Sequence, residues 1–196
     1  MTQNLNNNTI QITDSSQVRS TTTSYRRYYH IPLGSIDPGA SGATYTSPDG
    51  NTIGGWQLNA VGETLEAGTD IHADWDGASD LIVGVNFEVN VNNTGGLVTD
   101  TVDLKLVVFY KANGDLVTKT QTIEVATTVG QSAQYKKFNA SFTINWDEES
   151  NVVEAGDLVR FILNLETDTS EVDDIIINDC KFYYNTTHMG IESGDV

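Results

Sequence analysis

Apolar and polar residues alternate along most of the chain after residue 25, with the two-residue period of a β-strand. The clearest run covers residues 81–91, where every odd position from Leu81 to Val91 is apolar. The even positions between them are mostly polar, which is typical of a strand with one buried face and one solvated face.

Shorter or weaker alternating runs occupy much of the remaining chain. They cover residues 25–31, 53–58, 70–75, 102–110, 116–125, 138–146, 161–165 and 180–184. Asn113-Gly114 precedes the run at 116–125 and predicts a two-residue hairpin turn, because both residues tolerate positive φ. No stretch keeps the 3.6-residue period of a helix. We therefore predict an all-β fold of about eight to ten strands, an antiparallel two-sheet β-sandwich, with a jelly roll favoured over other sandwiches.

Residues 1–24 are polar, rich in Asn, Thr, Ser and Gln, and precede what we predict to be a single domain over residues 25–196. Only Ile10, Ile12 and Val18 offer apolar surface to bury, too little to offset the entropy lost on ordering. We expect an extended N-terminal arm that is either flexible or ordered against a partner. All three prolines lie in residues 32–55, which predicts a long loop within the domain.

The net charge of −17 is unevenly placed along the chain. Residues 1–28 hold Arg19, Arg26 and Arg27 against Asp14 alone, a net of +2, which leaves −19 for the remainder. Such an acidic body repels nucleic acids and anionic membranes, so we predict neither as a partner. The arginines either mark a solvated strand edge or dock on an acidic partner surface, such as a neighbouring copy of the chain.

Cys180 is the single cysteine, so no disulfide can form within the chain. Its place in an apolar strand predicts a small buried side chain rather than a nucleophile. The N-terminal residues show neither the charged nor the apolar region of a signal peptide, and no apolar run is long enough to span a membrane. We expect synthesis in a reducing cytoplasm without a secretory signal.

The segment Asp74-Trp75-Asp76-Gly77-Ala78-Ser79-Asp80 holds the most suggestive local chemistry. Closely spaced carboxylates beside a glycine are what a calcium ion binds, and Asp74, Asp76 and Asp80 are the candidate ligands. An acidic turn before the strand at 81–91 explains the same residues without an ion, and we predict no resident cofactor or metal. A second acidic loop, with the same two readings, contains four carboxylates: Asp168, Glu171, Asp173 and Asp174.

No residue pattern indicates an enzyme. The histidines have no ligand spacing, and the chain contains neither a nucleophile elbow nor a phosphate-binding glycine loop. Carboxylates number 27 in 196 residues, so neighbouring pairs carry little information about hydrolysis. Trp146 shares the inward parity of its strand and is expected in the core. Trp56 and Trp75 lie near loop ends, where flat rings could contact a glycan.

Five stretches together are similar to bacteriophage virion proteins of the jelly-roll type, as found in capsid decoration proteins, head fibres and tail fibres. They are Tyr29-His30-Ile31-Pro32, Gly55-Trp56-Gln57-Leu58, Asp74-Trp75-Asp76-Gly77, Gly156-Asp157-Leu158-Val159-Arg160-Phe161 and Asp173-Asp174-Ile175-Ile176-Ile177. Their order covers about residues 25–186. The resemblance implies a non-catalytic virion component, a homotrimer in contact with a major capsid protein or another virion protein.

Three readings of the function follow from these observations. The first is a non-enzymatic virion structural protein that decorates or stabilises the capsid surface, or forms a fibre, and is located on the virion surface. The alternative is a lectin-like carbohydrate-binding module that contacts a host receptor. An enzyme that acts on polysaccharide through paired carboxylates is the third and least supported reading.

Overall fold

The computed structural model describes the backbone of residues 2–5, 8–12 and 18–20, and both backbone and side chains of residues 24–40, 42–91, 100–130, 134–148, 151–166 and 174–187. Within these residues the regular elements are strands and one short 3₁₀ turn, η1 (Leu33–Ser35). The prediction of an all-β fold is confirmed. No helix of the described segments has the length and apolar character needed to cross a bilayer.

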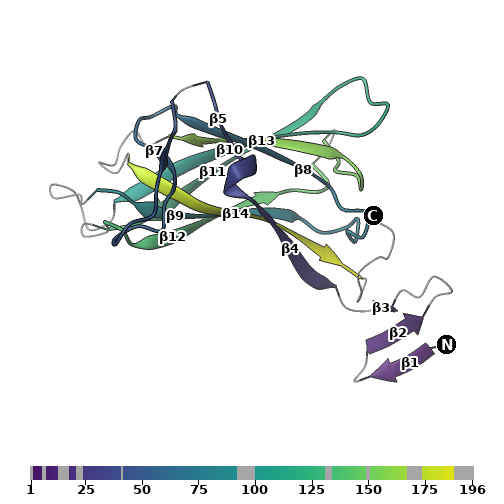
Figure 1. Cartoon of the computed structure of the whole chain (residues 1–196). Coiled ribbons are helices and arrows are strands. Elements are labelled where there is room, and N and C mark those ends of the chain that lie inside the picture. Colours follow the sequence, from purple (N-terminus) through teal and green to yellow (C-terminus); the bar gives the residue numbers. More distant parts are fainter. Residues whose placement is uncertain are drawn as a thin grey trace.

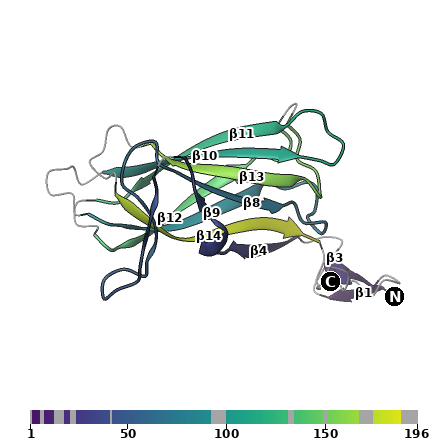
Figure 2. The same ribbon diagram turned by 45° about the horizontal axis from the view of Figure 1, so that its top comes forward.

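Two antiparallel sheets pack face to face (Figures 1 and 2). The first has the strand order β11 (Lys119–Thr128), β10 (Thr101–Lys111), β13 (Leu158–Leu165), β8 (Thr64–Asp70) and β5 (Asp37–Pro38). The second has the order β12 (Lys137–Ile144), β9 (Leu81–Val89), β14 (Ile175–Thr186), β7 (Gly55–Leu58) and β6 (Thr44–Thr46), and β4 (Tyr25–Ile31) also pairs with β14. From β8 onward the chain crosses repeatedly between the sheets, which gives the predicted jelly-roll type of sandwich.

The first strands of the chain form a small sheet of their own. It contains β1 (Thr2–Leu5), β2 (Asn8–Ile12) and β3 (Val18–Ser20), paired antiparallel in that order (Figure 1). The sequence analysis expected an arm here that is either flexible or ordered against a partner, and its described backbone segments pair with one another. Docking of this segment on a partner stays a prediction.

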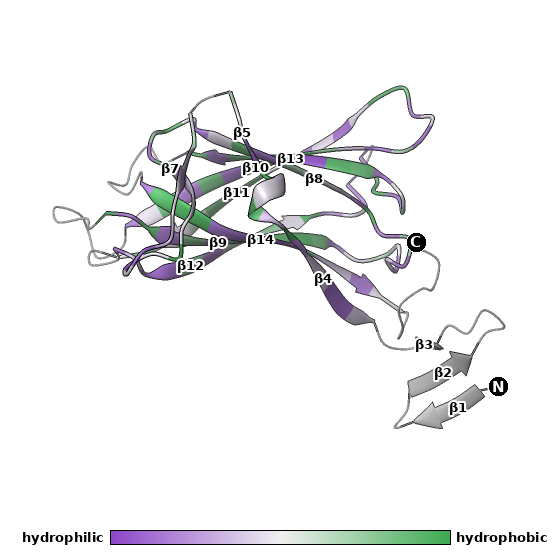
Figure 3. Cartoon of the chain, viewed as in Figure 1, coloured by the Kyte–Doolittle hydropathy of each residue, from purple (hydrophilic) through white to green (hydrophobic). Residues whose placement is uncertain are grey.

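The core lies between the sheets and is built from the inward residues of both. Its largest fully buried side chains include Tyr110, Phe87, Phe142 and Phe182. Burial of a side chain of this size contributes roughly 1.5–3 kcal/mol to stability. In Figure 3 the strands of the sandwich carry alternating green and purple bands, as the two-residue period requires, whereas much of β4 is purple. Cys180 is 5% exposed, as predicted, and burial raises the pKa of its thiol to about 12.

Two local predictions were wrong. The run at 70–75 is a loop rather than a strand: β8 ends at Asp70, and Ile71 and Trp75 fill the core from the loop that follows. The Asn113-Gly114 turn is not a two-residue hairpin, since β10 ends at Lys111 and β11 begins only at Lys119. Gly114 has positive φ but Asn113 does not, and Leu116 in the longer loop is 96% exposed.

An irregularity in β14 decides which side chains face the core. The register with β9 shifts between Ile177 and Asp179, so Asn178 is an extra residue, a β-bulge. Before the bulge the odd positions Ile175 and Ile177 belong to the core cluster, and after it the even positions from Cys180 to Tyr184 do. Asn178 is fixed by a 2.9 Å hydrogen bond from its Nδ2 to the Gly54 carbonyl.

Candidate functional site

The solvent face of the second sheet carries a regular grid of side chains from β4, β14, β9 and β12. Because alternate residues of a strand point to opposite faces, the pairing registers define its rows. One row is Tyr28, Tyr183, Ile82 and Thr143; the next is His30, Lys181, Gly84 and Ser141; a third is Asp179, Asn86 and Asn139. We call these residues, together with Arg26 at the end of β4, the Tyr28–Tyr183 face. Figure 2 shows β4 beside β14 at the edge of this layer.

Two tyrosines form the aromatic part of this face. Tyr28 and Tyr183 are direct cross-strand partners, with ring centroids 5.5 Å apart and an interplanar angle of 46°. Tyr28 is 54% exposed, and His30 meets its ring edge-on at 5.4 Å. Because Tyr28 lies directly beside Tyr183, the two rings form a continuous aromatic area on this face and make it a candidate contact surface. An open hollow of about 440 Å³ lies beside the pair and is lined by Arg26, Asp80, Ile82, Thr143, Tyr183, Tyr184 and Asn185.

Glycine at position 84 lets the Tyr183 ring lie over the sheet. A Cβ atom there would come within 2.8 Å of Tyr183 Cε2, closer than two carbons can approach. Arg26 places its guanidinium carbon 4.8 Å from the Tyr183 ring centroid, and Lys181 places Nζ 5.5 Å from the Tyr28 centroid. Both are cation–π contacts, which hold the cations at the aromatic surface.

Asp179 organises the polar part of the face. Its carboxylate is 3.1 Å from His30 Nδ1 and accepts hydrogen bonds from Asn86 Nδ2 at 3.0 Å and Lys181 Nζ at 3.0 Å. Partial burial raises the pKa of this carboxyl, but the hydrogen bonds from Lys181, His30 and Asn86 outweigh burial and lower it. Asn86 is in turn bonded to Asn139 across the strand pair. The result is a fixed row of amide and carboxylate groups beside the rings.

Asp74 fastens β4 from behind this face. Its carboxylate is 2% exposed and accepts hydrogen bonds from Arg27 Nη1 at 2.8 Å, while His72 Nδ1 lies 2.8 Å from its other oxygen. The His72 ring stacks on Tyr184, whose pKa is raised to about 12 by burial and by the neighbouring Asp74. Arg27 is therefore held by an ion pair within the protein, with 30% of its side chain exposed, and its role in docking stays a prediction. The side chain of Arg19 lies outside the described residues.

The other calcium candidates do not converge with Asp74. Asp76 Oδ1 accepts hydrogen bonds from Ser79 and Ala78 of its own turn, and Asp80 accepts one from the Trp146 backbone. Each carboxylate thus has separate protein partners, which fits the acidic-turn reading and gives no shared ion position. In the second acidic loop, Asp174 binds Gln57 and Asn90. Its other carboxylates, Asp168, Glu171 and Asp173, lie outside the described residues.

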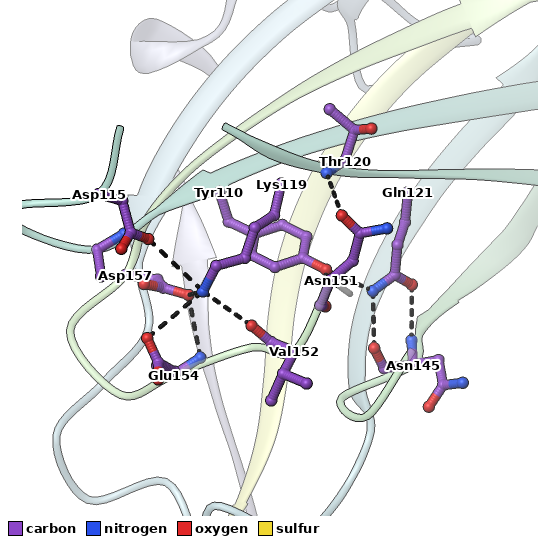
Figure 4. Close-up of polar contacts among 11 residues, drawn as sticks. Tyr110, Asp115, Lys119, Thr120, Gln121, Asn145, Asn151, Val152, Glu154 and Asp157 are labelled. Carbon is purple, nitrogen blue, oxygen red and sulfur yellow. Dashed lines mark hydrogen bonds and ion pairs between the residues drawn. The ribbon is translucent and has the colours of Figure 1, made fainter. Parts of the chain in front are cut away.

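Among the described residues, Asp115, Glu154 and Asp157 are the acidic group whose oxygens converge closely enough to hold a cation. Figure 4 shows that the Lys119 ammonium already lies among them, 3.4–3.7 Å from the three carboxylates. Burial lowers the pKa of Lys119, but the carboxylates outweigh burial and raise it. Lys119 also donates to the Val152 carbonyl at 2.9 Å. This cluster ties the loop after β10 to the segment before β13.

The two tryptophans assigned to glycan contact are not among the residues of the Tyr28–Tyr183 face. Trp75 is 6% exposed and donates its indole N–H to the Ser79 carbonyl, so its ring is largely covered by protein. Trp56 on β7 is partly buried, donates to the Leu33 carbonyl, and meets the ring of Tyr45 edge-on at 5.7 Å. Tyr45 is 55% exposed, so a glycan contact at Trp56 stays a prediction. Trp146 packs partly buried against the core, as expected.

Solved structures that resemble the chain include xylanase modules, a two-domain esterase active on acetylated mannans and a viral particle. The CBM36-1 domain of a multidomain xylanase from the hindgut metagenome of Trinervitermes trinervoides is 18% identical, with 81% of this chain and 96% of that chain covered and a TM-score of 0.40. The CBM22-1–GH10 modules of a Clostridium thermocellum endo-1,4-β-D-xylanase are 12% identical, covering 83% of this chain and 28% of that chain at a TM-score of 0.47. The infectious bursal disease virus VP2 subviral particle is 14% identical, with 90% of this chain and 37% of that chain covered and a TM-score of 0.39. No protein-family model matches the chain, and no curated protein matches it in sequence.

Sequence reasoning missed the Tyr28–Tyr183 face, although part of its signal was readable. Tyr28 alternates with the inward positions of its strand, and Tyr183 alternates with Cys180, Phe182 and Tyr184. Each ring could therefore have been placed on a solvent face. The pairing of the two rings could not be predicted, because nothing in the alternation shows that two segments so far apart in sequence become neighbouring strands or in which register they pair.

Proposed function

We propose that the chain is a non-catalytic carbohydrate-binding protein and that the Tyr28–Tyr183 face is its binding surface. The observation that carries the proposal is the pair of exposed Tyr28 and half-buried Tyr183 beside a fixed row of amide and carboxylate groups. A sugar ring has an apolar C–H face and an edge of hydroxyl groups. Aromatic rings match the first, while side chains that both donate and accept hydrogen bonds match the second.

The geometry favours binding over hydrolysis. Hydrolysis of a glycosidic bond needs a carboxylic acid that is protonated near neutral pH, together with a second carboxylate. Asp179 has a lowered pKa and already interacts with three side chains. It is therefore ionised and held in place, which suits an acceptor of sugar hydroxyls and not a general acid.

The test is a glycan array followed by titration calorimetry with whichever glycan binds. Tyr28→Ala and Tyr183→Ala should each weaken binding about tenfold, since an aromatic contact contributes roughly 1 kcal/mol beyond its buried area. Tyr45→Ala is the matched comparison, because Tyr45 is 55% exposed against 54% for Tyr28 but lies beside Trp56. Unfolding temperatures of all three variants establish that the fold is kept.

Each outcome has a clear meaning. Weaker binding for the Tyr28 and Tyr183 variants alone supports the proposal. Weaker binding for Tyr45→Ala alone would move the site to Trp56, where the sequence analysis placed one glycan contact. An array without any bound glycan would refute the carbohydrate proposal.

The second candidate is the virion structural protein, a homotrimer that docks on another virion protein. The small sheet β1–β3 favours it, because a separately paired N-terminal segment ahead of an acidic body suits a docking element. Light scattering of the whole chain and of a chain lacking residues 1–23 tests this function. A trimeric mass would support it, and a monomer in both would count against it.

A further inference from the structure

The Tyr28–Tyr183 face differs in charge from the rest of the molecule. The outward positions of its four strands carry the cations Arg26, Lys181 and Lys137. Against them stand Asp179 and Glu88, and Glu88 is only 4% exposed, with one oxygen accepting the backbone N–H of Ile53. The adjoining hollow adds Asp80, so three cations face three carboxylates and this surface is close to neutral on a chain whose net charge is −17. An anionic group therefore meets less repulsion here than elsewhere on the acidic chain.

Arg26 and Arg27 are neighbours in sequence with opposite roles. Arg27 points behind the sheet and is ion-paired with the buried Asp74. Arg26 is exposed on the face, and no ion pair joins it to any carboxylate within the described part of the chain. Its guanidinium instead rests at the Tyr183 ring, 4.8 Å from the centroid. An exposed guanidinium at an aromatic platform presents its N–H groups to solvent in the fork geometry that fits a carboxylate.

From these observations we propose that the ligand is an acidic glycan and that Arg26 binds the carboxylate of a uronic acid residue whose ring contacts Tyr28. This inference rests on the proposed function and adds the substrate class. Lys181 strengthens it: its ammonium lies 5.5 Å from the Tyr28 centroid and adds positive charge, although it also bonds Asp179. Asp179, bonded to Lys181 and Asn86, faces sugar hydroxyls rather than the carboxylate.

The acidic body does not prevent such binding at physiological salt. Charges farther than about 8 Å are largely screened at that ionic strength, so the nearby cations of the face dominate the contact. At low salt the body repels a polyanion over a longer range. We therefore expect slower association with an acidic glycan at low salt, the reverse of the behaviour of a basic protein.

The experiment uses oligomers of galacturonate, glucuronate and guluronate, each beside its carboxyl-reduced neutral form, in calorimetry with the full chain. At least one acidic form should bind about tenfold more tightly than its neutral counterpart, the size expected for a charge-assisted contact at a solvated surface. Arg26→Gln should abolish that preference. Arg160→Gln is the matched control, because Arg160 is an exposed arginine on β13 of the other sheet, and it should leave the preference unchanged.

The outcomes separate this inference from the proposed function. Equal binding of acidic and neutral forms, or a preference that survives Arg26→Gln, overturns the acidic-glycan inference and leaves the glycan face standing. Binding of neutral array glycans alone, lost on Tyr28→Ala, has the same meaning. If no glycan of either class binds, both proposals fail together.

Discussion

Replacing Asp74 by alanine tests whether β4 is held by the buried ion pair behind the Tyr28–Tyr183 face. The carboxylate is 2% exposed, and its partners Arg27 and His72 have side chains that are 30% and 39% exposed. Removing one member of a buried pair costs about 3–5 kcal/mol, because the other charge is left without a partner. Arg27 can regain some hydration, so we expect a loss of about 2–3 kcal/mol in the free energy of unfolding.

Urea unfolding monitored by tryptophan fluorescence measures this loss. For a domain of this size it corresponds to a fall of about 8 °C in the unfolding temperature. Asp80→Ala removes an exposed carboxylate from the same loop and should cost less than about 1 kcal/mol. In a double-mutant cycle, Asp74→Ala should cost about 1–2 kcal/mol less when Arg27 is already methionine. A loss below about 1 kcal/mol for Asp74→Ala, or no coupling to Arg27, would refute the reasoning.

Three further predictions concern single residues. Cys180 is buried, and the pKa of its thiol is raised to about 12. It should therefore react with a chromogenic disulfide reagent only when the protein is unfolded in urea. Rapid reaction of the native protein would contradict its burial. Asp179 has a lowered pKa in the folded state, so the stability it provides is present above its ordinary pKa of 3.8 and is lost as the pH falls through the folded-state pKa. In urea unfolding at acidic pH, the free energy of unfolding should therefore decline less steeply with falling pH for Asp179→Asn than for the unmodified chain. Gly84→Ala should displace the Tyr183 ring and weaken glycan binding in calorimetry. The unfolding temperature should not fall, since glycine within a strand is itself unfavourable. Unchanged affinity would show that the position of the ring is unimportant for binding.

The long strands could be predicted from the sequence because each one is half-buried. All odd positions from Leu81 to Val89 are fully buried, as the alternation in that segment indicated. The strand β8 was missed because its segment offers only Leu65 and Ala67 to the core, a pattern too short to stand out. The opposite error occurred just after it, where buried Ile71 and Trp75 belong to a loop whose apolar residues alternate by chance.

The candidate site was harder to predict than the fold. Carboxylates drew attention at Asp74, Asp76 and Asp80 because they are close in sequence, yet the structure gives each a different partner. The tyrosine pair consists of residues from opposite ends of the domain, and a single sequence contains no information on which strands become neighbours. Arg26 and Arg27 looked equivalent in sequence, and only strand parity separates the exposed residue from the ion-paired one.

Because of the bulge at Asn178, the number of residues in β14 decides which side chains lie on the Tyr28–Tyr183 face. With one residue fewer between Ile177 and Asp179, every following side chain would change sides: Phe182 would point to water, and Lys181 and Tyr183 would enter the core. Point substitutions on the face can therefore accumulate one at a time, whereas an insertion or deletion here cannot. Among homologous chains, we expect the spacing between the isoleucines and Tyr183 to be retained even where the ligand-contacting residues themselves diverge.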